Sequence, residues 1–134
     1  MTSRVTYKGQ LRTECVHLRS GDQFHTDAPV DNHGLGQAFS PTDTVATGLA
    51  SCMLTMMGIR HGAQEGSLDG SYAEVTKHMA ADPRRIARIE VDLYLPASTP
   101  ARDRKILENT ARTCPVWYSL HEDIRKEVRF FWTL

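Results

Sequence analysis

Two of the three cysteines in this chain, Cys52 and Cys114, fall in segments that the sequence predicts to be inward-facing parts of two different helices. Two inward thiols allow one particular reaction: a thiolate attacks the O–O bond of a peroxide and becomes a sulfenic acid, which the second thiol captures as a disulfide. This chemistry requires a partly accessible first thiol with a lowered pKa and an apolar pocket for the organic part of the peroxide. It also requires a second thiol within disulfide reach, with Cα atoms roughly 4.4 to 6.8 Å apart.

The thiol of Cys52 needs a group that lowers its pKa. Leucine and methionine residues surround it on its own predicted helix, and apolar surroundings raise the pKa of a thiol. A positively charged partner must therefore oppose that effect. Arg12, Arg19 and His33 are the nearest candidates in the preceding segments, either within one chain or across a subunit boundary.

Asp43 is a further candidate residue of the pocket, and it also has a simpler structural role. Ser40 suits an N-cap, Pro41 suits the first helical position, and Asp43 falls where a capping-box carboxylate reaches back. Nine residues at about 100° per residue place Asp43 on the far side of an ideal helix from Cys52. The pattern therefore favours capping over catalysis for Asp43.

Each cysteine taken alone has an ordinary structural explanation. Free cysteine is among the most frequently buried residue types, so Cys52 or Cys114 alone is typical of a small core residue. Cys15, on a predicted strand face, has no partner that the sequence supplies, and no role is assigned to it. The alternative function is therefore a stress-associated or small-molecule-binding dimer with structural cysteines and no peroxidase activity.

Two other chemistries have weaker support. Six histidines accompany the three cysteines, but none shows the Cys-x-x-Cys or His-x-x-x-His spacing that is typical of zinc sites. A thiol-ligated metal protein stays a third hypothesis, and no residue is assigned as a metal ligand. The segment Gly48-Leu49-Ala50-Ser51 is not a Gly-x-Ser-x-Gly elbow and lies inside a predicted helix, which argues against a nucleophilic hydrolase.

The element that must position Cys52 is a helix predicted for residues 40–59. From Val45 to Ile59 the apolar and small residues go nearly all the way round, so other elements or a partner chain must cover most sides of this helix. A bilayer span needs roughly 18 uninterrupted apolar residues, and Ser51 and Thr55 interrupt the run. The pattern therefore indicates a buried core helix and no membrane span.

Cys114 is expected at the end of a second helix, on its inward side. Ser98-Thr99-Pro100 gives the start signal, and Pro115 disfavours helical continuation directly after Cys114. The inward residues recur at three- and four-residue steps: Ile106, Leu107, Ala111 and Cys114.

Alternating patterns predict strands in the rest of the chain. The clearest is residues 86–95, with Ile89, Val91, Leu93 and Leu95 on the inward face. The other predicted strands cover residues 4–8, 11–19, 23–26, 71–79 and 128–134, and a short helical turn is predicted within 116–124. Strands separated by two helices, without repeating strand-helix-strand units, predict an α+β protein with a mainly antiparallel sheet.

Length and composition bound the remaining possibilities. A chain of 134 residues predicts a single domain, residues 1–134, small enough that subunit association adds to its core. Its 16 basic and 16 acidic residues cancel, so neither nucleic acid nor an anionic membrane is an expected partner. The N-terminus lacks a secretory pattern and the cysteine count is odd, so we expect a cytoplasmic protein without a disulfide framework.

Several motifs taken together carry a resemblance to a known family. They are the Ser40-Pro41-Thr42-Asp43 helix start, the eleven residues from Pro41 to Cys52, the Ala50-Ser51-Cys52 core, and Cys114-Pro115-Val116 followed by Ser119-Leu120 and a final strand. The Asp27-Ala28-Pro29 and Gly34-x-Gly36 loop adds to them. In these features the chain resembles the OsmC/Ohr family, the osmotically inducible and organic hydroperoxide resistance proteins, over nearly its whole length.

The resemblance implies an OsmC-like fold, with sheets outside and a long buried helix from each chain inside an intertwined homodimer whose active sites lie at the subunit boundary. It implies a thiol peroxidase that acts on organic hydroperoxides, with Cys52 as the peroxidatic and Cys114 as the resolving cysteine. The implied reductant is a dithiol such as a lipoyl group, and no metal or organic cofactor is implied.

The chain departs from the organic hydroperoxide resistance branch at the helix start. Members of that branch carry a glutamate directly after the helix-start proline and an arginine in the N-terminal strands. Here Thr42 stands at the glutamate position and Asp43 follows it, as in the broader OsmC-like branch, and no arginine aligns cleanly.

Overall fold

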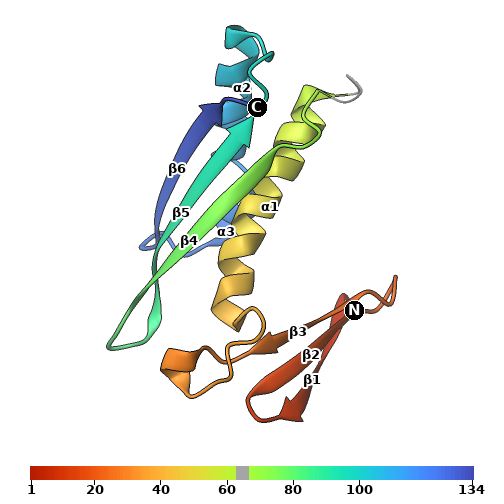
Figure 1. Cartoon of the computed structure of the whole chain (residues 1–134), viewed down its shortest axis with the longest axis vertical. Coiled ribbons are helices and arrows are strands. Elements are labelled where there is room, and N and C mark those ends of the chain that lie inside the picture. The colour runs from red at the N-terminus through yellow and green to blue at the C-terminus, as the bar shows by residue number, and fades with distance from the viewer. Residues whose placement is uncertain (63–66) are drawn as a thin grey trace. The chain divides into compact units, whose positions relative to one another are not determined.

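The computed structural model describes residues 1–62 and 67–134, which contain two three-stranded sheets and three α-helices (Figure 1). The chain divides into two compact units, Met1–Val45 and Ala46–Leu134. In chain order the elements are β1 (Ser3–Gly9), β2 (Arg12–His17), β3 (Gln23–Asp27), the 3-10 helix η1 (Val30–Asn32), α1 (Pro41–His61), β4 (Tyr72–Ala80), β5 (Arg85–Leu95), α2 (Ala101–Ala111), α3 (Pro115–Ser119) and β6 (Arg125–Trp132).

In the first unit, β1, β2 and β3 form an antiparallel meander, as predicted for this part of the sequence. Val5 pairs with Cys15 and Cys15 with Phe24, so these three side chains share one face of the sheet. Val5 and Phe24 are 62% and 50% exposed. β2 ends at His17, before the predicted end at residue 19, because the chain turns back there: the N–H of Gly21 donates to the carbonyl of His17 at 2.8 Å.

An ion pair with a buried carboxylate joins β2 to β3. The guanidinium of Arg12 donates from Nε to Oδ1 of Asp27 at 2.7 Å and from Nη2 to Oδ2 at 2.9 Å. Asp27 is 1% exposed and also accepts from the backbone N–H of Gln37 at 3.1 Å. Arg12 lowers the pKa of Asp27, because its hydrogen bonds and charge favour the carboxylate more than burial disfavours it. The pair therefore holds the segment around Gln37 against the sheet.

α1 begins with the predicted capping box. The backbone N–H of Ser40 donates to Oδ2 of Asp43 at 2.8 Å, and the backbone N–H of Asp43 donates to Oγ of Ser40 at 3.1 Å. Ser40 is buried, so these side chains satisfy backbone groups that water does not reach. The Asp43 carboxylate thus takes part in starting the helix.

In the second unit, β4, β5 and β6 lie side by side in one sheet (Figure 1). β4 and β5 pair antiparallel, whereas β5 and β6 pair parallel, with Ile89 opposite Lys126 and Leu95 opposite Trp132. Three of the four strand pairs are antiparallel, in agreement with the predicted mainly antiparallel class. The alternation of the last strand predicts its faces but does not predict the direction of its pairing.

The core of the second unit lies between this sheet, α1 and α2. The inward residues of β5 are those that the alternation predicts, and each is completely buried: Ile89, Val91, Leu93 and Leu95. The buried residues of α1 recur at steps of three and four and form one stripe: Ala46, Leu49, Ala50, Met53 and Met57. Leu107 and Ala111 of α2 complete the cluster. Burial of one such leucine or methionine side chain contributes roughly 1.5–3 kcal/mol.

Outside this stripe α1 keeps apolar surface in contact with solvent. Val45 is 40% exposed and Ile59 is 67% exposed. Within the described chain the helix is therefore covered along one stripe, whereas the sequence predicts cover on most sides. None of the helices in the described residues is both long enough and apolar enough to cross a membrane.

The second helix ends earlier than the sequence predicts, and this changes the position of Cys114. α2 ends at Ala111, and Cys114 is the N-cap of α3 instead of the last inward residue of α2. Pro115 is the physical reason, because a residue before proline is driven out of the helical region and proline suits the first position of a new helix. Cys114 accordingly has extended backbone angles, φ −74° and ψ 154°.

Replacing Asp27 by asparagine is expected to lower the free energy of unfolding at neutral pH and to have much less effect in acid. The folded-state pKa of Asp27 is lowered from an unfolded value of about 3.9. Its carboxylate therefore contributes stability above that value, and the contribution is lost as pH falls through the folded-state pKa. Urea unfolding of wild type and Asp27→Asn at pH 7 and at about pH 2.5 measures the difference.

Asp22→Asn is the matched control, because Asp22 is an exposed aspartate in the turn before β3. It should leave the unfolding midpoint unchanged at both pH values. Equal destabilisation by Asp27→Asn at both pH values would contradict the role assigned to the charge.

Candidate active site

Cys114 lies at the start of α3 with its thiol sealed from solvent. The side chain is 0% exposed and belongs to the core cluster of the second unit. Its sulfur accepts a hydrogen bond from the backbone N–H of Trp117 at 3.4 Å, so the thiol caps the short helix. Pro115 thus fixes the backbone, and the cap fixes the sulfur.

The structure brings the thiols of Cys52 and Cys114 together, although they lie on α1 and before α3. Cys52 is half-buried and packs against the core cluster to which Cys114 belongs, and its thiol lies near enough to that of Cys114 to raise the pKa of the Cys114 thiol. Both are free thiols in this structure. The pair therefore has one member that solvent reaches and one that it does not.

Burial raises the pKa of the Cys114 thiol. The thiol of Cys52 adds to the increase, while the backbone N–H groups of Trp117 and Val116 oppose it. Because the net change is upward, Cys114 is a neutral thiol at neutral pH. In that state it is a weak nucleophile, because the thiolate is the form that attacks.

Apolar and aromatic side chains that follow Cys114 in the chain pack against the core cluster to which it belongs. Those of α3 and the following turn that pack against the core cluster are Val116, Trp117, Leu120 and Ile124. The ammonium of Lys126 lies 5.5 Å from the centre of the Trp117 ring, and the guanidinium of Arg112 lies 4.7 Å from the centre of the Phe130 ring. Lys126 and Arg112 are not among the candidates that the sequence suggests. Each side chain meets its aromatic ring only in the folded chain, and no spacing in the sequence indicates that contact.

The four other candidate residues all lie in the first unit. Arg12 is engaged in the ion pair with Asp27, and Asp43 in the capping box. Arg19 is exposed in the turn between β2 and β3. His33 is exposed and closes η1 in the left-handed conformation, with φ 66°. Arg19 and His33 form no ion pair among the described residues.

Cys15 lies on β2 in the first unit, whereas Cys52 and Cys114 belong to the second unit. Its sulfur lies 3.8 Å from Oγ1 of Thr13 on the same face of the strand. Among residues 1–62 and 67–134, no three His, Cys, Asp or Glu side chains gather as a group able to hold a metal ion.

The fold and the cysteine pair define a small α+β protein of the OsmC/Ohr class. The chain belongs to the family of OsmC-like proteins, whose model matches residues 34–129. That match includes α1 with Cys52 and the α3 start with Cys114.

The chain is also similar to several solved structures. One, described as an osmotic stress induced and detoxification response protein from Psychrobacter arcticus 273-4, is 51% identical and has a TM-score of 0.92, over 97% of this chain and 95% of that chain. The organic hydroperoxide resistance protein OsmC from Legionella pneumophila is 15% identical with a TM-score of 0.74, over 98% and 97%. The organic hydroperoxide resistance protein OhrB of Bacillus subtilis is 18% identical with a TM-score of 0.68, over 97% and 98%. The last two likenesses establish the fold alone, and none of the curated proteins matches the chain.

In the native, reduced protein, an alkylating reagent such as iodoacetamide is expected to modify Cys52 well before Cys114. Cys114 is buried and its pKa is raised, so both access and thiolate content are low. Timed quenching followed by peptide mass spectrometry measures the rate at each cysteine. In urea the two rates should become similar, and native rates that are already equal would contradict the observed burial.

Proposed function

We propose that this protein is a thiol peroxidase that reduces organic hydroperoxides, with Cys52 as the peroxidatic cysteine and Cys114 as the resolving cysteine. The observation that carries the proposal is the proximity of the half-buried Cys52 to the sealed Cys114, which share one packed cluster and in which the Cys52 thiol raises the pKa of the Cys114 thiol. Disulfide formation after peroxide attack requires two neighbouring cysteines whose sulfur atoms are able to meet.

The order of the two steps follows from the unequal exposure of the thiols. In the first step the Cys52 thiolate attacks one peroxide oxygen, the O–O bond breaks, and the alkoxide takes up a proton and leaves as an alcohol. Cys52 is then a sulfenic acid. In the second step the Cys114 sulfur attacks the Cys52 sulfur, and the Cys114 proton and the hydroxyl leave as water. One peroxide is reduced and two thiols are oxidised to one disulfide.

A dithiol reductant of the lipoyl type completes the proposed cycle. One reductant thiolate attacks the disulfide and forms a mixed disulfide, and its second thiol then releases the protein thiol and leaves as an oxidised dithiol. Attack at the Cys52 sulfur is favoured, because Cys52 is half-buried whereas Cys114 is sealed. Cys114 is then the leaving group and takes up a proton.

The group that activates Cys52 is proposed among Arg12, Arg19 and His33. Arg12 already forms an ion pair with Asp27, so its charge is largely compensated. Arg19 and His33 are exposed and form no ion pair among the described residues, so their charge or hydrogen bonds remain for a thiolate. Asp43 is proposed to shape the pocket through the start of α1.

One equivalent of cumene hydroperoxide is expected to reduce the free thiols of the protein from three to one, because Cys52 and Cys114 form a disulfide. Thiol counting with a chromogenic disulfide and intact mass spectrometry measure the change. Dihydrolipoamide should restore all three thiols.

Three variants separate the roles. Cys52→Ser should lose the fast reaction, Cys114→Ser should accumulate a sulfenic acid that dimedone traps at Cys52, and Cys15→Ser should still lose two thiols. A wild type that keeps three thiols would refute the peroxidase. It would favour the alternative, a stress-associated or small-molecule-binding OsmC-like dimer with structural cysteines; the description of the 51% identical protein names osmotic stress and detoxification.

We further propose that the protein acts as a homodimer. Apolar side chains remain uncovered in both units: Val5, Tyr7 and Phe24 of the first sheet are 62%, 65% and 50% exposed, and Ile59 of α1 is 67% exposed. Soluble monomers rarely leave such surface open when it is contiguous, and a second copy of the chain would bury it. The predicted cover of α1 on most sides would then come partly from the partner.

Sedimentation equilibrium at micromolar concentration is expected to give twice the chain mass of 15.1 kDa. Val5→Asp with Phe24→Asp should shift the protein toward the monomer, because it places charge on the exposed apolar face. Thr6→Asp, on the opposite face of β1, is the control and should leave the dimer intact. A wild type of 15.1 kDa at these concentrations would refute the dimer.

A further inference from the structure

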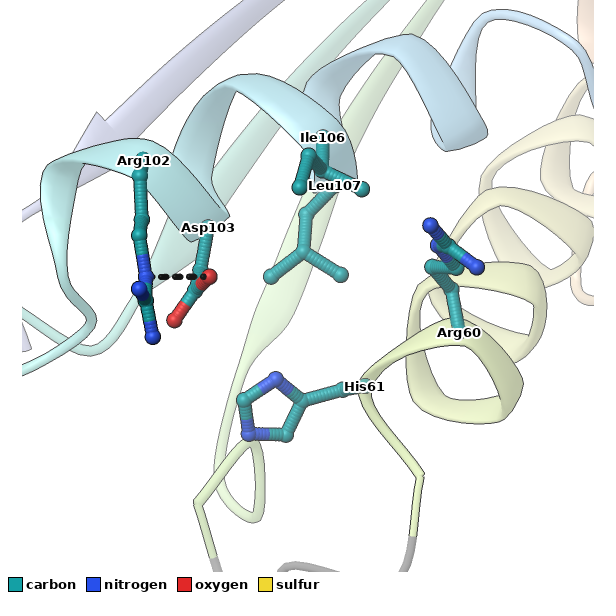
Figure 2. Close-up of a pocket in the computed structure, with 6 residues that line it drawn as sticks. All are labelled: Arg60, His61, Arg102, Asp103, Ile106 and Leu107. Atoms are coloured by element: carbon teal, nitrogen blue, oxygen red, sulfur yellow. Dashed lines mark ion pairs between the residues drawn. The ribbon is translucent and has the colours of Figure 1, made fainter.

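A pocket of about 230 Å³ lies between the end of α1 and the beginning of α2 (Figure 2). It belongs entirely to the second unit and contains neither Cys52 nor Cys114. Its lining residues are Arg60 and His61 of α1 and Arg102, Asp103, Ile106 and Leu107 of α2. The peroxidase proposal makes no use of this pocket.

The charged groups of the pocket leave one positive charge in excess. Arg60 and Arg102 each carry one, and Asp103 compensates one of them through an ion pair of 3.4 Å between its Oδ1 and Nε of Arg102. The side chain of Arg102 is 87% exposed, so this pair is weak and an arriving anion is able to compete for the guanidinium. Arg60 forms no ion pair among the described residues. The pocket therefore matches a ligand with a single negative charge.

His61 adds an unsatisfied polar atom. Its Nε2 is buried and has no hydrogen-bond partner among the described residues. Such atoms are rare, because a buried polar atom without a partner loses its hydrogen bonds to water and gains none in exchange. Cations in a last helical turn, like Arg60 and His61, often serve only to stabilise the helix end. That role does not explain why Nε2 of His61 has no partner. It also does not explain why α2 contributes the guanidinium of Arg102 to the same pocket.

Apolar side chains form the middle of the pocket. Ile106 and Leu107 lie between the Arg102–Asp103 pair on one side and Arg60 on the other, and the His61 ring lies opposite Leu107 (Figure 2). Leu107 is 2% exposed and Ile106 is 43% exposed, so a ligand lying on them would remove apolar surface from water. The volume is below the roughly 300–1,000 Å³ of pockets that hold drug-sized molecules, which limits the ligand to a small one.

We propose that this pocket binds a small organic monocarboxylate, with its carboxylate between Arg60, Arg102 and His61 and its short apolar chain on Ile106 and Leu107. A guanidinium fork matches the two oxygens of a carboxylate, and the single excess charge of the pocket matches a monoanion better than a phosphate dianion. In the tautomer that carries its proton on Nε2, the imidazole of His61 would also donate a hydrogen bond to the carboxylate. This binding is independent of the thiol chemistry.

Hexanoate is the probe, and nuclear magnetic resonance of the full chain with isotope-labelled histidine is the measurement. Hexanoate is expected to shift the ring signals of His61 saturably, and loss of those signals in His61→Gln assigns them. Arg60→Gln with Arg102→Gln should weaken the binding roughly tenfold or more, because each removes charged hydrogen bonds to the carboxylate. The neutral probe 1-hexanol should cause no such shift.

Arg4→Gln is the matched control, since it removes one guanidinium from an exposed position on β1 and should leave the affinity unchanged. Ile106→Ala should weaken hexanoate and leave the weaker binding of acetate unaltered, because only the longer ligand reaches the apolar surface. Absence of a saturable His61 shift overturns the site. Inorganic phosphate that binds as tightly as hexanoate, or an equal loss of affinity in Arg4→Gln, overturns recognition of a monocarboxylate.

Discussion

The packing of one stripe of α1 onto the inner face of β5 is the contact on which the rest of the second unit depends. Ala46, Leu49, Ala50, Met53 and Met57 meet the completely buried side of the strand. Cys52 precedes Met53 by one residue and is therefore turned about 100° from the stripe. This angle explains why Cys52 is half-buried: it lies on the flank of the buried stripe and not at its centre.

The two helix starts near the cysteines use the same kind of bond with different atoms. At α1 the capping atom is the hydroxyl oxygen of Ser40, which is among the best acceptors for backbone N–H groups. At α3 the capping atom is the sulfur of Cys114, a weaker acceptor, at 3.4 Å from the nitrogen of Trp117. At this completely buried position the thiol serves both as a small apolar core group and as a weak helix cap.

Local patterns in the sequence predict those parts of the structure that local physics decides. The capping box at Ser40, the alternation of β5 and the helix around Cys52 depend on neighbouring residues, and all three agree with the structure. The end of the second helix was predicted wrongly, because the periodicity that continues to Cys114 is overridden by the backbone restriction before Pro115. The periodic apolar residue still marks Cys114 correctly as buried.

Features that depend on distant segments do not appear in any local pattern. The pairing of Arg12 with Asp27, the position of Lys126 over Trp117 and the meeting of Arg60 with α2 each require the tertiary fold. The proximity of Cys52 and Cys114 also depends on the tertiary fold. Its prediction depended on recognising a chemical pair, since neither cysteine alone has a spacing that signals the other.

The parallel alignment of β5 and β6 limits the positions that Cys114, in the connection between them, is able to occupy. A chain that leaves one strand and re-enters the sheet in the same direction must travel back along the whole length of that strand before it resumes. Here the return path carries α2 and α3, and it is anchored at one end by backbone hydrogen bonds that join Leu134 to Leu95 and Ala97. The length of this connection therefore sets the position of Cys114. Deletions within it would displace the Cys114 sulfur along the sheet even if both strands kept their register.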